Sequence, residues 1–195
     1  MADAYRIAII GSGPAGLSAA GRAADLGLSH VLLEKTDHLS DTIYKYQKGK
    51  HVMATPSQLV LRSDMDFDAG KREAVLGTWD EQAASLGVNV RLNSEVTAIE
   101  GDAGNFQIKL ADGETIQAEN VILAIGTQGN PNTLRCPGGD LPHVQYQLDD
   151  PGEYVDEHIT VIGSGDAGIE NALGLAADAE QGLSLIHISE PTRQY

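Results

Sequence analysis

The chain opens with two short apolar runs separated by one amphipathic stretch. Residues 6–10 and 30–34 have the length and apolar content of buried strands. Between them, Leu17, Ala20 and Ala24 fall on one face of a helix that we expect to end near residue 26. Strand, helix and strand in this order predict a parallel βαβ unit.

The middle of the chain predicts a second helix and a further parallel strand. No clear period runs through residues 36–68, which predicts a long, partly structured excursion. Asp68 is placed to cap a helix over residues 70–86, and residues 88–92 form the strand after it. The buried face of this helix is expected to carry Val75, Leu76, Trp79, Ala83 and Leu86.

Alternating apolar and polar positions then predict an antiparallel meander. Its three segments are residues 95–100, 106–110 and 115–118, and an Asp-Gly pair supplies the turn between the last two. An apolar run at residues 121–125 predicts a fully buried strand that ends at Gly126. Together these elements predict an α/β fold with a parallel sheet and an inserted antiparallel meander.

The pattern of strand, glycine-rich turn and helix occurs twice. The sequences GSGPAG and GSGDAG begin at Gly11 and Gly163, and each follows an apolar strand. A segment rich in proline and glycine, residues 130–142, lies between them and suggests a domain boundary. We therefore expect one domain over residues 1–132 and the start of a second, truncated domain over residues 133–182.

We interpret the end of the chain as foreign to the rest. Residues 183–193, LSLIHISEPTR, resemble the in-frame translation of a sequencing adapter, so residues 183–195 are predicted to be a non-native tail. The alternative is an ordinary strand over residues 183–188 followed by a polar tail. On the first interpretation the chain is a fragment, and we expect it to be inactive by itself and to bind a cofactor weakly or not at all.

Composition and charge disfavour several classes of function. The chain has 28 acidic and 13 basic residues and a formal net charge of −15, which disfavours binding to nucleic acid or anionic membranes. It contains no apolar run of about 18 residues and no signal-like N-terminus, which predicts a cytoplasmic protein without a membrane span. The histidines show no metal-ligand spacing, so no metal site is expected. Backbone amides can still hold a phosphate-bearing cofactor in so acidic a chain.

The first glycine-rich turn has the spacing of a dinucleotide site. Gly11 permits the tight turn, Gly13 lets a pyrophosphate approach the backbone, and Gly16 allows the helix to pack closely on the strand. Pro14 falls in the first helical turn, where its missing N–H matters least. Glu34 ends the second strand and is placed to accept hydrogen bonds from a ribose hydroxyl. These residues predict a site for the ADP half of a cofactor and leave FAD and NAD as alternatives.

The same segment resembles the FAD-binding signature of the pyridine nucleotide–disulfide oxidoreductase superfamily, to which Ala20 and Gly27 also conform. Residues 121–131, VILAIGTQGNP, resemble the second FAD motif of that family, in which a glycine passes close to the flavin. Val96 lies where the family contacts adenine through its backbone. The resemblance implies a Rossmann-like FAD-binding domain and identifies FAD as the cofactor of the first site.

The second turn resembles the NAD(P)H-binding motif of thioredoxin-reductase-like flavoproteins, in which an acidic residue also occupies the position of Asp166. Charge complementarity with the helix N-terminus is an equally good reason for an acid at Asp166. The resemblance implies a second Rossmann-like domain that binds NAD(P)H and leaves the choice between NADH and NADPH open. The predicted cofactor-binding residues are Gly11, Gly13, Pro14, Ala15, Gly16, Glu34, Lys35, Val96, Ala124 and Gly126 for FAD, and Gly163, Gly165, Asp166, Ala167 and Gly168 for NAD(P)H.

The resemblance implies an oxidoreductase in which hydride passes from NAD(P)H to the flavin. The electrons then pass to an unidentified acceptor, either a redox protein or a small molecule. The single cysteine, Cys136, excludes a redox cysteine pair within residues 1–182, and no catalytic residue is predicted. A non-enzymatic flavin-binding module and a flavin monooxygenase of the same fold are the alternatives. We expect the full-length protein to be a homodimer.

Overall fold

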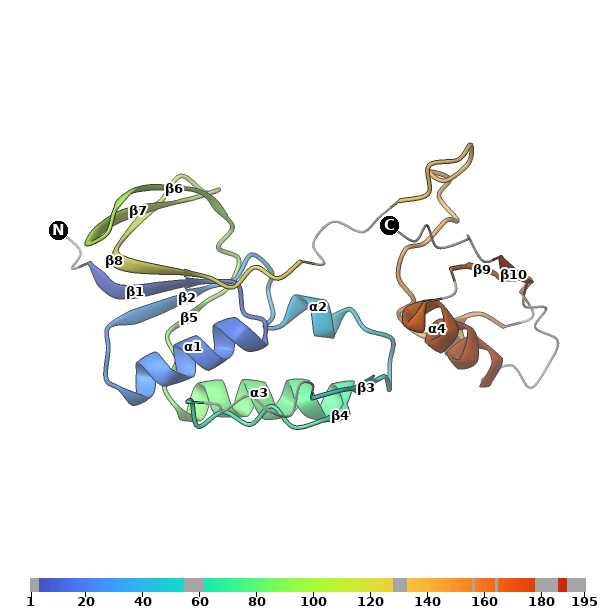
Figure 1. The fold of residues 1–195 in the computed structure, drawn as a ribbon, viewed down its shortest axis with the longest axis horizontal. Helices are drawn as coiled ribbons and strands as arrows, with labels where there is room; N and C mark the ends of the chain where they lie inside the picture. Colours follow the sequence, from blue (N-terminus) through green and yellow to red (C-terminus); the bar gives the residue numbers. More distant parts are fainter. Residues whose placement is uncertain are drawn as a thin grey trace, which may run out of the picture. The chain divides into compact units, whose positions relative to one another are not determined.

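The computed structural model of the chain contains two compact units (Figure 1). The first unit comprises Met1–Lys45 and Gly49–Asn132, and the second comprises Tyr46–Lys48 and Thr133–Tyr195. The assignment of an FAD domain and an NAD(P)H domain to the two parts of the chain stays a prediction. The residues that the structure describes are 4–54, 62–127, 133–155, 157–163, 165–177 and 186–188.

A six-stranded sheet forms the centre of the first unit. Its strands are β1 (Tyr5–Ile10), β2 (His30–Leu33), β5 (Val90–Arg91), β6 (Val96–Asp102), β7 (Asn105–Leu110) and β8 (Thr115–Leu123). Their order across the sheet is β5-β2-β1-β8-β7-β6. β1 pairs in parallel with β2 and β8, β2 pairs in parallel with β5, and β7 runs antiparallel to β6 and β8. The predicted α/β fold with a parallel sheet and an antiparallel meander is therefore confirmed.

The sheet packs its two faces against different layers. The helices α1 (Pro14–Asp25) and α3 (Arg72–Ser85) lie on the same side of it in Figure 1, and Leu17 and Ala20 of α1 are fully buried. Because successive side chains of a strand point to opposite faces, β1 and β2 also contribute to a second core with the meander. This second core consists of Ala8, Ile10, Val31, Leu33, Ile108, Leu110, Ile116 and Ala118.

One strand, β8, replaces the two strands predicted at residues 115–118 and 121–125. Its first residues pair with β7, and from Ala118 onwards it continues along β1. The prediction that residues 121–125 are fully buried is wrong, because Leu123 and Ile125 are 62% and 69% exposed. Past Ala118 the strand has left β7, and among the described residues only β1 pairs with it there.

Helix α3 begins later than predicted. Asp68 does not cap it, because the N-cap position is Lys71. The residues just before the helix form a short strand, β4 (Gly70–Lys71), that pairs with β3 (His51–Val52) and keeps the chain extended up to Arg72. On its predicted buried face, Val75, Trp79 and Ala83 are buried, whereas Leu76 and Leu86 are partly buried.

The second unit repeats the strand, turn and helix pattern. Its elements are a 3-10 turn, η1 (Pro151–Glu153), β9 (Thr160–Ile162), α4 (Asp166–Ala177) and β10 (Ile186–Ile188). β10 pairs in parallel with β9, so three residues of the predicted non-native tail form a strand. This pairing agrees with either origin of the tail, which stays a prediction. Over the described ranges, no helix is long and apolar enough to cross a membrane.

Candidate functional site

The turn between β1 and α1 is tightly packed at two of its glycines and open at the third. Gly11 has a φ of +96°, and a Cβ atom on it would lie 2.6 Å from the carbonyl oxygen of Ala124. A Cβ atom on Gly16 would overlap the carbonyl oxygen of Gly11, whereas one on Gly13 would have no atom within 4 Å. Packing therefore requires Gly11 and Gly16, and Gly13 leaves the backbone open to an approaching group.

The N-terminus of α1 fits a negatively charged ligand. Gly13 is its N-cap residue and offers no side chain to the first N–H groups, and Pro14 follows as the first residue of the helix. The first turn, which includes the exposed Ala15, holds no acidic residue. Uncapped N–H groups and the helix dipole both favour an anion, such as a pyrophosphate, at this position.

Ala124 brings the end of β8 against the same turn. Its N–H donates to the carbonyl oxygen of Ile10 at 2.8 Å, and its own carbonyl oxygen lies on the side of Gly11 where a Cβ atom would be. Gly126 follows with a φ of +63° and open space on its Cβ side. The two segments that resemble FAD motifs therefore lie side by side, while residues 128–131 of the second motif are outside the described residues.

Glu34 lies beside the turn, and its carboxylate is already hydrogen-bonded. It is 6% exposed, and its Oε2 accepts from the N–H and the hydroxyl of Ser12 at 3.0 and 2.5 Å. Its Oε1 accepts from the N–H of Thr36 at 3.1 Å and shares the hydroxyl of Thr36, at 3.2 Å, with the carbonyl oxygen of His38 at 2.8 Å. The sequence motifs did not identify Ser12 or Thr36 as partners of Glu34. Two features of the sequence could have indicated them. Ser12 is a hydroxyl residue inside the glycine motif, and Thr36 is a second hydroxyl residue two positions after Glu34.

Lys35 and Val96 occupy the margins of this region. Lys35 is exposed next to Glu34. The N–H of Ser94 donates to the carbonyl oxygen of Glu34 at 2.8 Å, so the chain leading into β6 starts beside the end of β2. The side chain of Val96 packs against the meander core, and a contact from its backbone to adenine stays a prediction.

The second glycine-rich turn reproduces the geometry of the first. Gly163 has a φ of +123°, a Cβ atom on Gly168 would overlap the carbonyl oxygen of Gly163, and one on Gly165 would have no atom within 4 Å. The N–H of Ile169 donates to the carbonyl oxygen of Gly165 at 3.0 Å, as that of Leu17 does to Gly13 at 2.9 Å. The difference lies in the first helical turn, where α4 carries an acid. Asp166 begins this helix, and Asp166 and Ala167 are both exposed.

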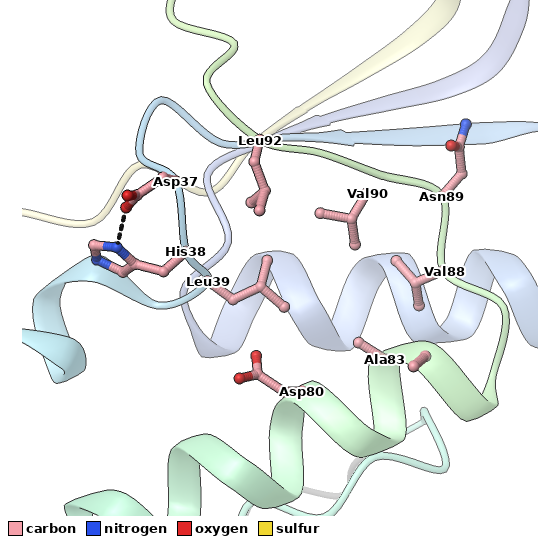
Figure 2. A pocket seen from close by; sticks show the side chains of 10 residues that line it. Asp37, His38, Leu39, Asp80, Ala83, Val88, Asn89, Val90 and Leu92 are labelled. Atoms are coloured by element: carbon pink, nitrogen blue, oxygen red, sulfur yellow. Dashed lines mark hydrogen bonds and ion pairs between the residues drawn. The ribbon is translucent and has the colours of Figure 1, made fainter.

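A separate pocket of about 560 Å³ lies in the first unit between α3, β5 and the segment after β2 (Figure 2). In it, His38 is hydrogen-bonded to Asp37 and to Asp41, the first residue of the short helix α2 (Asp41–Tyr44). Burial raises the pKa of Asp80 on the opposite wall, and His38 opposes that rise. The pocket shares no residue with the predicted cofactor site. Its lining consists of Asp37, His38, Leu39, Asp80, Ala83, Ala84, Val88, Asn89, Val90 and Leu92.

Other reactive groups stand apart from the two turns. Cys136 is exposed, and it is the one cysteine of the sequence. In the part of the chain that the structure describes, no three His, Cys, Asp or Glu side chains are grouped so that they could hold a metal ion. At each of the two glycine-rich turns, the open side of the middle glycine leaves room for a dinucleotide to approach the backbone.

Comparison with known proteins agrees with this geometry. The family model described as pyridine nucleotide-disulphide oxidoreductase matches residues 8–190. A ferredoxin–NADP reductase from Ignicoccus hospitalis is 26% identical over 179 residues, which cover 92% of this chain and 55% of that protein. The bacilliredoxin reductase of Bacillus subtilis is 28% identical over 171 residues, which cover 86% of this chain and 52% of that protein. The solved bacillithiol disulfide reductase from Staphylococcus aureus is 24% identical with a TM-score of 0.81, covering 95% of this chain and 57% of that one.

The chain spans about half the length of the curated relatives it matches. The likeness to the solved reductase confirms the fold. The family match runs through both glycine-rich turns and the end of β8, which are the segments that carry the resemblance in the sequence. The chain belongs to the pyridine nucleotide-disulphide oxidoreductase family.

Proposed function

We propose that this chain is part of an FAD-dependent oxidoreductase that accepts hydride from NAD(P)H. The observation that carries the proposal is that the turns at Gly11 and Gly163 have the same geometry. In each, a Cβ atom on the glycine five residues later would overlap the backbone, and the glycine between the two has open space on its Cβ side. A protein that only stores a flavin needs one such turn. Two turns therefore favour an oxidoreductase over a non-enzymatic flavin-binding module.

The first turn is the proposed FAD site. The N–H groups at the start of α1 would hold the pyrophosphate, and the open side of Gly13 would admit it. Glu34 would accept a ribose hydroxyl in place of the hydroxyl of Thr36, which has a second acceptor in the carbonyl oxygen of His38, and its charge would repel a 2′-phosphate. Bound FAD supplies the redox chemistry, and the chain binds and orients it.

The second turn is the proposed NAD(P)H site, with Gly165 on its open side. The relatives carry the names ferredoxin–NADP reductase and bacilliredoxin reductase, which support a redox protein as the electron acceptor. A small molecule, or oxygen in a monooxygenase of the same fold, is the alternative acceptor. The 195 residues contain one cysteine, so no disulfide relay can form within them. A cytoplasmic location and a homodimer of the longer protein are part of this proposal.

Flavin titration tests the first site. We expect the chain to quench FAD fluorescence weakly but saturably, and ADP to compete because it carries the half of FAD that the turn would hold. FMN, which lacks that half, should bind much more weakly. Equal binding of FMN and FAD, or no competition by ADP, would overturn the assignment.

A further inference from the structure

The backbone strain of the first unit is concentrated beside the glycine-rich turn. Among the described residues, the non-glycine residues with positive φ are Ser40 at +58° and Asn93 at +52°. The N–H of Asn93 donates to the carbonyl oxygen of Thr36 at 2.9 Å, two residues after Glu34, and Ser40 bonds to Ser12. L residues adopt this conformation rarely and keep it only where surrounding contacts hold them there.

The conformation of Ser40 is not explained by helix capping. Serine at an N-cap position ordinarily accepts a hydrogen bond from a helix N–H. Ser40 is the N-cap residue of α2, but its side chain makes no such bond. Its hydroxyl instead donates to the carbonyl oxygen of Ser12 at 2.9 Å, and its N–H donates to the hydroxyl oxygen of Ser12 at 2.8 Å. Ser40 thus directs both groups at Ser12.

Ser12 is the residue whose hydrogen bonds hold the glycine-rich turn in place. It lies between Gly11 and Gly13 and is fully buried. Its N–H and hydroxyl donate to Glu34, while its hydroxyl and carbonyl oxygens accept from Ser40. Four hydrogen bonds therefore converge on the one position of the turn that lies between the packed Gly11 and the open Gly13.

We propose that Ser40 is a positioning residue for the dinucleotide site, which it serves by fixing Ser12 and with it the turn that precedes α1. The inference rests on the proposed function of that turn. With the hydrogen bonds between Ser40 and Ser12 in place, the N–H groups at the start of α1 are ordered before the ligand arrives. Without it, binding must order the turn as well, and this lowers the affinity.

Two substitutions at Ser40 separate this role from a general effect on stability. Ser40→Ala removes the hydroxyl and keeps the strained φ, whereas Ser40→Gly removes the hydroxyl and relieves the strain. Ser85→Ala is the matched control, because the hydroxyl of Ser85 donates to the carbonyl oxygen of Gln82 at the end of α3. We expect both Ser40 variants to weaken FAD binding about tenfold, Ser40→Gly to retain its thermal midpoint, and Ser85→Ala to match the wild type in affinity.

Hydrogen exchange in the cofactor-free chain gives a readout that does not require FAD. We expect the backbone amides of residues 11–13, 15 and 16 to exchange faster in Ser40→Gly than in the wild type or Ser85→Ala. Wild-type FAD affinity together with wild-type exchange in Ser40→Gly would overturn the role of Ser40 and leave the proposed function intact. If the wild-type chain bound FMN as tightly as FAD while Ser40→Gly still exchanged faster, the proposed function would fall and the role of the hydrogen bonds from Ser40 to Ser12 would stand.

Discussion

A Cβ atom on Gly16 would overlap the carbonyl oxygen of Gly11 at well under 3.0 Å. Because the overlapping group is backbone, no side chain can move aside to make room. Gly16→Ala should therefore push α1 away from β1 and lower the free energy of unfolding by about 1–3 kcal/mol. Urea denaturation measures this loss, and a midpoint equal to that of the wild type would show that the turn tolerates a side chain there.

Gly13→Val should separate binding from folding. The position has open space and a φ of −67°, which any residue can adopt. Valine is a poorer N-cap than glycine, so we expect a loss of stability below about 1 kcal/mol. Its branched side chain would block the pyrophosphate and abolish FAD binding. Thermal melting and flavin titration of the same preparation check the two expectations, and a flavin spectrum like that of the wild type would refute the second.

Gly165→Val is the corresponding change in the second turn. A Cβ atom on Gly165 would also have no atom within 4 Å, so this variant should fold as the wild type does. We expect it to lose affinity for NADH and NADPH and to keep its affinity for FAD, because each turn would hold one dinucleotide. Calorimetric titration with each nucleotide makes the comparison. Loss of FAD binding would show that the two sites had been assigned wrongly.

Glu34→Gln should lower both stability and FAD affinity. The carboxylate accepts from two donors on each oxygen, and the amide group of glutamine would turn a donor toward either Ser12 or Thr36. A buried donor left without an acceptor costs about 1–3 kcal/mol. Glu114→Gln, in the exposed ion pair with Arg91, is the control and should unfold at the wild-type urea concentration. Equal effects of the two changes would argue against a special role for Glu34.

Asp41→Asn should reveal a pH-dependent contribution to stability. Burial would raise the pKa of Asp41, but the hydrogen bonds and charges of Lys45 and His38 outweigh it and hold the pKa below its usual value. The charged form therefore stabilises the fold above the unfolded pKa of about 3.9, and this stabilisation disappears as the pH falls through the lower folded pKa. We expect the variant to lose about 0.5–1 kcal/mol at neutral pH. Urea titrations from pH 7 to pH 3 should show the two proteins converging at the acid end, and a constant difference would contradict this origin.

Much of the candidate site could be predicted from the chain because its signals are local. Glycine spacing between a predicted strand and a predicted helix indicated the turn at Gly11, and the structure has Gly11 and Gly16 in close contact there. The partners of that turn were not predictable in the same way. Ser40 is an ordinary polar residue in a segment without periodicity, and its bonds to Ser12 exist because the segment after β2 folds back over the turn.

The sequence by itself determined the order of the elements, the α/β class and the two glycine-rich turns, because hydrophobic period and glycine spacing act over a few residues. The tertiary structure alone decided three further features. The first is the start of α3 at Arg72, which follows from the pairing of β3 with β4. The second is the exposure of Leu123, which lies beyond the part of β8 that pairs with β7. The third is the set of hydrogen bonds from Ser12 and Thr36 to the carboxylate of Glu34. The pairing of β3 with β4 and the bond from Ser12 to Glu34 both join residues distant in sequence, and that bond forms only once β1 and β2 are side by side. Their energies depend on which surfaces the fold brings together.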